Sequence, residues 1–118
     1  MCSSDLNMPK HSGVTTLQSA ATATGNGSSL LLDRYTHVAL QVSGTFSATV
    51  TFEVTVDGTN WVSAACLDVS DTTRTHKATT TAVGVFTFDE FVGVTGLRAR
   101  ISAYTSGSVT VVANAVGW

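Results

Sequence analysis

The chain has 118 residues, which is enough for one domain with one core, and it carries a net charge of −2. Only 12% of its residues are charged, against about 25% in ordinary domains, and no run of Lys and Arg is present to neutralise phosphates. We therefore expect no nucleic-acid partner. The N-terminal region lacks the apolar stretch of a signal peptide or transmembrane helix, so we expect synthesis in the cytoplasm and no membrane association.

The first part of the chain divides into an arm and two weakly patterned strands. Residues 1–13 are polar, contain the only proline and show no periodicity, so they predict a flexible N-terminal arm. We assign residues 14–118 to a single β-sandwich domain. Residues 14–24 alternate weakly, which favours an edge strand, and residues 30–32 predict a short buried strand after a Gly-Asn-Gly turn.

The clearest pattern is two alternating runs, residues 38–42 and 50–56, separated by a break at Gly44. Period-two alternation buries one face and wets the other, which is typical of antiparallel strands. The inward positions are Val38, Leu40, Val42, Val50, Phe52, Val54 and Val56. An Asp-Gly pair after the second run predicts a chain reversal, and residues 61–66 form the returning strand.

The second half of the chain ends in a predicted hairpin. Residues 67–83 favour a loop in which a Thr-rich segment can pair as a strand, and residues 85–88 predict a short strand. The last hairpin turns at residues 105–107. Its inward residues are Leu97, Ala99, Ile101 and Ala103 before the turn and Val109, Val111 and Ala113 after it. In total, about eight short strands predict an all-β fold, an antiparallel β-sandwich or jelly roll.

No catalytic or metal-binding constellation stands out in the sequence. The histidines (His11, His37 and His76) fall on the arm, the outer face of a strand and a loop, so they are not expected to converge as zinc ligands. No serine lies in a G-x-S-x-G motif, and Cys66 is expected to behave as a small core residue. Turn and solvent roles are favoured over calcium binding for the carboxylates Asp57, Asp68, Asp71, Asp89 and Glu90. We expect no enzymatic activity, no metal and no cofactor.

Arg98 and Arg100 lie two residues apart, so a strand places both on its solvated face. They predict either a strip that binds an acidic partner or a pairing of one arginine with Glu53 on a neighbouring strand, and we favour the pairing.

Four aromatic residues, Trp61, Tyr104, Phe46 and Trp118, are candidates for stacking on a sugar. Trp61, just after a turn, is more typical of a core residue at the edge of a sandwich. Trp118, at the end of the sequence, either folds back or docks on a neighbour, because tryptophan is enriched at interface hot spots.

Two segments, VALQVSGTFSATVTFEVTVDGTNW (residues 38–61) and GVTGLRARISAYTSGSVTVVANA (residues 93–115), carry a resemblance to a known family. With the spacer between them they resemble small β-sandwich structural proteins of tailed bacteriophages. The resemblance implies a module that occurs in head decoration (cement) proteins, head fibres and tail-associated adhesins.

From this resemblance we expect a virion structural protein, and specifically a decoration protein on the capsid surface. Its expected partners are the major capsid protein and copies of itself in a homo-oligomer. Leu6 and Met8 would anchor the arm on the capsid, and Trp118, Arg98 and Arg100 are further candidate contacts. Two alternatives stay open: a receptor- or carbohydrate-binding module of a tail or head fibre, with a glycan partner, and a neck or tail component.

Overall fold

The computed structural model describes residues 11–32, 35–88 and 94–117. These residues form nine strands and no helix, and every strand pairing is antiparallel, which confirms the predicted all-β class. The strands are β1 His11–Ala21, β2 Ser29–Leu31, β3 His37–Thr55, β4 Val62–Ser63, β5 Cys66–Asp68, β6 His76–Lys77, β7 Thr79–Thr80, β8 Gly84–Phe88 and β9 Gly96–Gly117.

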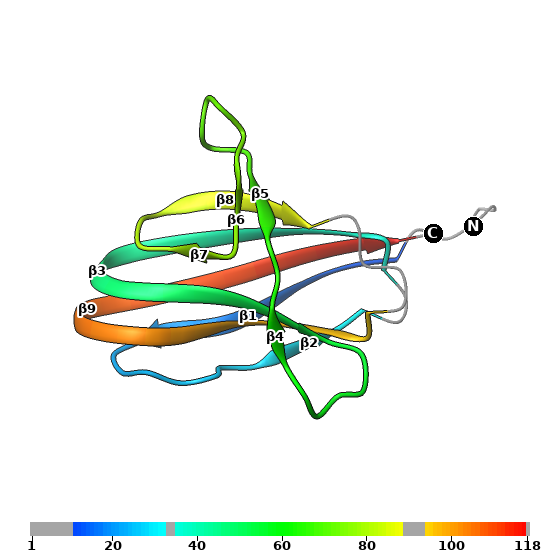
Figure 1. The fold of residues 1–118 in the computed structure, drawn as a ribbon, viewed down its shortest axis with the longest axis horizontal. Helices are drawn as coiled ribbons and strands as arrows, with labels where there is room; N and C mark the ends of the chain where they lie inside the picture. The colour runs from blue at the N-terminus through cyan, green and yellow to red at the C-terminus, as the bar shows by residue number, and fades with distance from the viewer. Residues whose placement is uncertain (1–10, 33–34, 89–93, 118) are drawn as a thin grey trace.

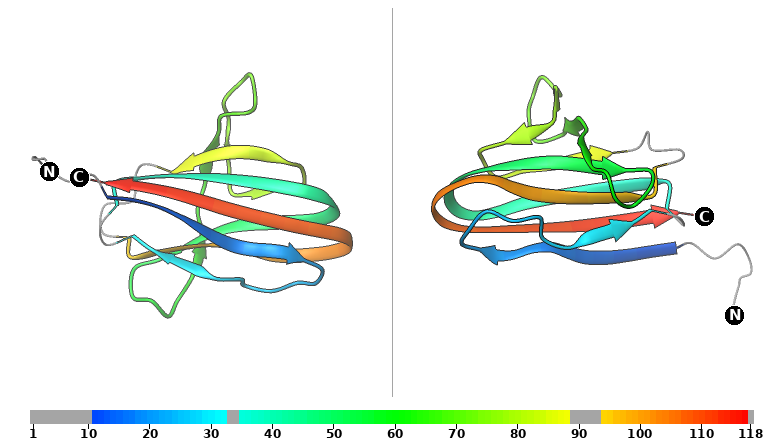
Figure 2. Two further views of the ribbon diagram at one scale, coloured as in Figure 1. Left: turned by 180° about the vertical axis from the view of Figure 1, so that it is seen from behind. Right: turned by 60° about the horizontal axis from the view of Figure 1, so that its bottom comes forward.

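The two long strands, β3 and β9, pair along their whole length as one ribbon. This ribbon folds back on itself, so that its two halves form the centres of two facing layers (Figure 1). In the first layer the strand order is β1-β9-β3-β8-β5-β6. In the second layer β2 pairs with the other half of β9, and β4 and β7 pair with the other half of β3. Figure 2 shows the closed end of the folded ribbon from two other sides.

Two glycines allow the ribbon to fold at this closed end. Gly44 in β3 and Gly107 in β9 both have positive φ, 113° and 88°. A Cβ at Gly44 would lie 2.3 Å from the carbonyl oxygen of Ser108, and one at Gly107 would lie 2.1 Å from that of Thr45. The backbones therefore approach more closely here than any L side chain allows.

The predicted hairpin that turns at residues 105–107 is wrong. Instead of reversing onto itself, β9 continues through these residues, and Phe46 and Ser47 of β3 pair with Gly107 and Ser106. The break predicted at Gly44 is likewise a bend inside one continuous strand. The fold thus has two strands of 19 and 22 residues in place of four short ones.

The core fills the space between the two layers. Of the predicted inward residues, Val38, Leu40, Val42, Val50, Phe52, Val54, Leu97, Ala99, Ile101, Val109, Val111 and Ala113 are buried. The rings of Phe52 and Phe86, one from each layer, have centroids 5.0 Å apart. Two inward predictions are wrong: Val56 is 68% exposed because β3 ends at Thr55, and Ala103 is exposed next to a register shift in the pairing with β3.

The shorter strands largely follow the sequence pattern. β1 lies at one end of the first layer, as an edge strand should, but it begins at His11, inside the predicted arm. The predicted returning strand 61–66 is wrong in its extent: only Val62–Ser63 pair with β3, as β4, and Cys66 begins β5, which pairs with β8. β7 is the predicted Thr-rich pairing. The β5–β6 hairpin projects away from the sandwich (Figure 1).

Gln18 closes the side of the sandwich between β1 and β2. β2 pairs with residues 96–98 of β9, and Gly25 bridges Ile101, which leaves the carbonyl of Ala99 between two pairings. The buried side-chain amide of Gln18 donates to this carbonyl over 2.8 Å and to that of Gly25 over 3.2 Å. A side chain thus satisfies a backbone acceptor that the strands leave over.

We expect Gly107→Ala to lower the free energy of unfolding by about 2 kcal/mol or more, because it combines positive φ with a backbone clash. Gly25→Ala is the control, since a Cβ there meets nothing within 4 Å. Urea unfolding of both variants measures the difference. Equal stability of the two variants would contradict the close approach at the bend.

Candidate binding faces

The structure places two of the five predicted contact residues. Arg98 and Arg100 lie on β9 in the second layer, whereas Leu6, Met8 and Trp118 lie outside the described residues. No helix that could cross a membrane occurs in the described part of the chain.

Both arginines pair with Glu53 on the outer face of the second layer. The Nε of Arg98 donates to Glu53 Oε1 over 2.8 Å, and the Nε of Arg100 donates to Oε2 over 3.2 Å. This follows from the register, since Glu53 lies directly opposite Arg98 and diagonal to Arg100. The Glu53 side chain is only 10% exposed, so the two arginines supply contacts that water would make to an exposed carboxylate. The favoured pairing is therefore present, with two arginines rather than one.

Trp61 extends this charged cluster, and Tyr104 does not. The guanidinium carbon of Arg98 lies 4.3 Å from the centre of the Trp61 ring, which is a cation–π arrangement. The hydroxyl of Tyr104 donates to the carbonyl of Gly107, near the closed end of the ribbon. A Cβ at Gly96 would lie 3.1 Å from the Trp61 ring, so this ring lies next to the first residue of β9. Tyr104 is eight residues further along β9, a strand length of about 26 Å. The two rings do not form one sugar platform.

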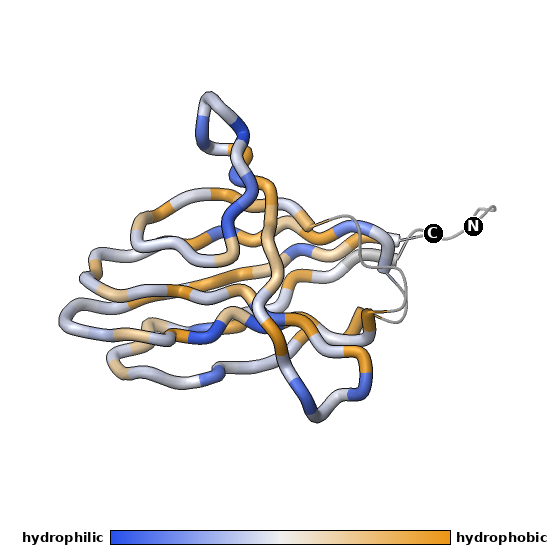
Figure 3. Tube along the Cα trace, viewed as in Figure 1, coloured by the Kyte–Doolittle hydropathy of each residue, from blue (hydrophilic) through white to orange (hydrophobic). Residues whose placement is uncertain are grey.

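The outer face of the first layer has a different character. We call the outward residues of β1, β9, β3 and β8 the uncharged face. On these strands they alternate with core residues, and they are Val14, Thr16, Thr110, Val112, Asn114, Val116, His37, Ala39, Gln41, Ser43, Val85 and Thr87. None of these described side chains is an aspartate, glutamate, lysine or arginine. The most hydrophilic stretches instead include the β5–β6 hairpin and the β3–β4 turn, both of which project from the sandwich (Figure 3).

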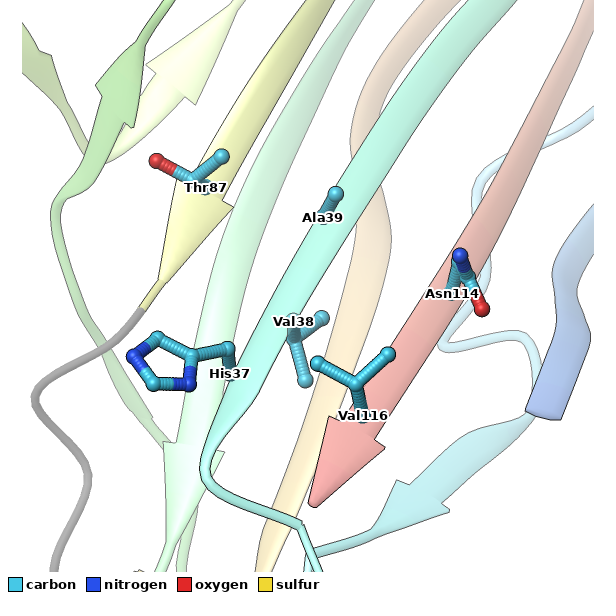
Figure 4. A pocket seen from close by; sticks show the side chains of 6 residues that line it. All are labelled: His37, Val38, Ala39, Thr87, Asn114 and Val116. Carbon is cyan, nitrogen blue, oxygen red and sulfur yellow. The ribbon is translucent and has the colours of Figure 1, made fainter. Parts of the chain in front are cut away.

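The uncharged face is hollowed around Ala39. Ala39 lies between Thr87 of β8 and Asn114 of β9, with His37 and Val116 near the strand ends (Figure 4). This hollow has a volume of about 320 Å³, and a second one of about 330 Å³ adjoins it between Val14 and Val85. The cause is local, because the small Ala39 side chain stands among larger neighbours.

Several ionisable groups of the described residues are buried or paired within the domain. Burial raises the pKa of the Cys66 thiol to about 12, so it stays protonated in the core as predicted. The carboxylates of Asp68 and Asp71 accept hydrogen bonds from hydroxyls of their own hairpin, and Asp68 pairs with Lys77 over 2.9 Å. Within residues 11–32, 35–88 and 94–117, no three His, Cys, Asp or Glu side chains gather closely enough to hold a metal ion. Asp89 and Glu90 lie outside these ranges.

Two of the three histidines lie in strands rather than where the sequence places them. His37 is on the outer face of β3, as expected, but His11 belongs to β1 and His76 to β6.

The uncharged face was not anticipated. The signal that could have found it is the charge content of the alternate positions, which contain no Asp, Glu, Lys or Arg in residues 37–43 and 108–117.

No protein-family profile matches the sequence, and no curated protein matches it. The fold, however, is similar to that of two solved phage-derived proteins. The SPBc2 prophage-derived protein YomS aligns with a TM-score of 0.84 and 16% identity over 96% of this chain and 99% of its own. The PBSX exported protein XepA aligns with a TM-score of 0.86 and 19% identity over 95% of this chain. The aligned region spans 40% of the length of XepA. At these identities the likeness establishes the fold, a β-sandwich.

We expect Glu53→Gln to destabilise the protein by roughly 1–3 kcal/mol, because it removes the common counter-charge of two arginines. Arg100→Gln is the matched variant: its side chain is 40% exposed, and the loss should stay below about 1 kcal/mol. Chemical unfolding at neutral pH compares the two. If Glu53→Gln cost no more than Arg100→Gln, the carboxylate would not organise the cluster.

The turn after β3 should make stability depend on acid pH. The backbone N–H groups of Asn60 and Thr59 donate to the Asp57 carboxylate and hold its pKa below the ordinary 3.8. A lowered pKa in the folded state adds stability above pH 3.8, and this contribution is lost as the pH falls below it. Asp57→Ser keeps a hydrogen-bond acceptor but cannot titrate in this range. Thermal unfolding should show the advantage of the native chain at pH 7 shrinking steadily towards pH 2, and a constant advantage would contradict the assignment.

Proposed function

We propose that this chain is a non-enzymatic structural protein of a bacteriophage particle, and specifically a decoration protein that binds the outside of the capsid. The observation that carries the proposal is the fold: the sandwich is similar to the two solved phage-derived proteins described above. In YomS this sandwich accounts for 99% of the solved chain, so the module without an added domain occurs in a phage-derived protein.

The physical character of the domain suits this role. Its two layers are held by strand pairing along the whole of β3 and β9, and its surface is rich in hydroxyls and poor in charge. A decoration protein acts additively, because each copy that binds the assembled shell stabilises it by mass action. The proposed partners are the major capsid protein and further copies of the chain. Leu6 and Met8 are the proposed anchors on the capsid, with Trp118, Arg98 and Arg100 as further contacts.

One observation favours a second candidate. XepA is described as an exported protein, which makes an exported phage protein that acts away from the particle the alternative. A carbohydrate-binding module gains less support, because the Trp61 ring stacks on Arg98 next to the start of β9, whereas Tyr104 lies eight residues further along that strand.

The experiment is to purify particles from a strain that expresses the chain and to count its copies relative to the major capsid protein by quantitative mass spectrometry. The decoration role predicts copies on the scale of the capsid subunits, and lower occupancy for the double variant Leu6→Ser, Met8→Ser. Arg74→Ser, at an exposed position in the loop between β5 and β6, is the control variant and should leave occupancy unchanged.

Other outcomes would contradict the decoration role. A few copies per particle would indicate a neck, tail or fibre component. Recovery in the medium but not with the particles would indicate the exported protein.

A further inference from the structure

The two outer faces of the sandwich differ in charge, and this difference points to a use for one of them. The outer face of the second layer carries Glu53, Arg98 and Arg100, whereas the uncharged face carries no Asp, Glu, Lys or Arg among its described side chains. On a solvated sheet face, outward positions are the usual place for charged residues. Their absence across four neighbouring strands favours a face that meets another protein surface.

The uncharged face also exposes apolar side chains around a hollow. Val14 is 70% exposed and Val85 is 37% exposed, and they stand on the two outer strands of the four. Ala39 forms the floor between them, beside two hollows of about 320 and 330 Å³. A pleated face with raised valines and a low centre can interlock with another sheet, as the inner faces of a sandwich do.

We propose that two copies of this chain pair face to face through their uncharged faces, related by a two-fold axis. A two-fold contact sets each surface against its own copy, so every charge near the axis would meet a like charge. A face with no Asp, Glu, Lys or Arg among its described side chains avoids that repulsion, which makes a second copy a suitable partner. A different protein would gain specificity from complementary charges, and this face offers none.

The size of the face sets the expected strength of the pairing. The four strands lie about 4.8 Å apart, and with about seven residues from each of β1, β9 and β3 and the five residues of β8 the face covers about 400 Å² in projection. Counted over both copies the contact is about 800 Å², below the roughly 1,000 Å² of stable specific interfaces, so the dimer should be weak, reversible and dependent on concentration. The inference concerns the isolated protein and does not depend on the proposed role in a virion.

Charge exchange at Gln41 tests the proposal. Gln41 is exposed and lies on β3, one of the two inner strands of the face, so in the dimer it lies near the two-fold axis. We expect the wild-type chain to dimerise in sedimentation velocity runs from a few micromolar to several hundred micromolar. Gln41→Glu and Gln41→Lys should each weaken the dimer by about tenfold or more, since like charges then face each other. An equimolar mixture of the two variants should recover the dimer.

Leu31→Glu is the control, because Leu31 is 68% exposed on β2 of the second layer and the change introduces the same charge outside the uncharged face. It should leave dimerisation unchanged, and thermal unfolding should show that all variants fold. A wild-type chain that stays monomeric at the highest concentration would overturn the proposal. So would Gln41 variants that dimerise like the wild type, or a mixture that forms no more dimer than either variant alone. None of these results bears on the particle experiment, so the two proposals fail separately.

Discussion

The pairing of β3 with β9 is the interaction on which the rest of the structure depends. β1 and β2 pair with β9, while β4, β7 and β8 pair with β3. Among the nine described strands, only β5 and β6 pair with neither: β5 pairs with β8, and β6 pairs with β5. Because the ribbon folds at Gly44 and Gly107, each of its two strands contributes to both layers. The inward residues of the two halves of the ribbon therefore face each other across the core. There, Phe52 of the second-layer half of β3 packs against Phe86 of β8, the strand that pairs with the first-layer half of β3.

This arrangement also explains why the two outer faces differ. In the first-layer half of the ribbon, the outward side chains include Ala39, Gln41 and Val112. In the second-layer half, they include Glu53 and the two arginines that pair with it. On the charged side the groups pair among themselves, since the Glu53 carboxylate accepts from two guanidinium groups and Trp61 covers one of them. Among its described side chains the uncharged face has no such ion pair, which is the basis of the dimer that we propose.

The sequence predicts the layers and the core well because alternation is a local property. It predicts the connections poorly where the same residues are compatible with two backbone geometries. Small residues and glycine at 105–107 indicate a hairpin and a bend equally, and only the pairing with Phe46, far away in the chain, decides between them. The burial of Gln18 has the same origin, because its acceptor is a carbonyl on β9 that β2 leaves unpaired. The Glu53–Arg98 pairing was within reach of the sequence, whereas the uncharged face required knowing which strands lie side by side.

The most direct test of this account is a solution NMR measurement of cross-strand contacts at the closed end of the ribbon. A ribbon that folds back predicts unbroken contacts between β3 and β9 through the pairs Thr45 with Ser108, Phe46 with Gly107 and Ser47 with Ser106. If β9 were instead a hairpin of its own, residues 97–103 would show contacts to residues 109–113, and those between Phe46 and Gly107 would be missing. That result would contradict the folded ribbon and with it the assignment of the two faces.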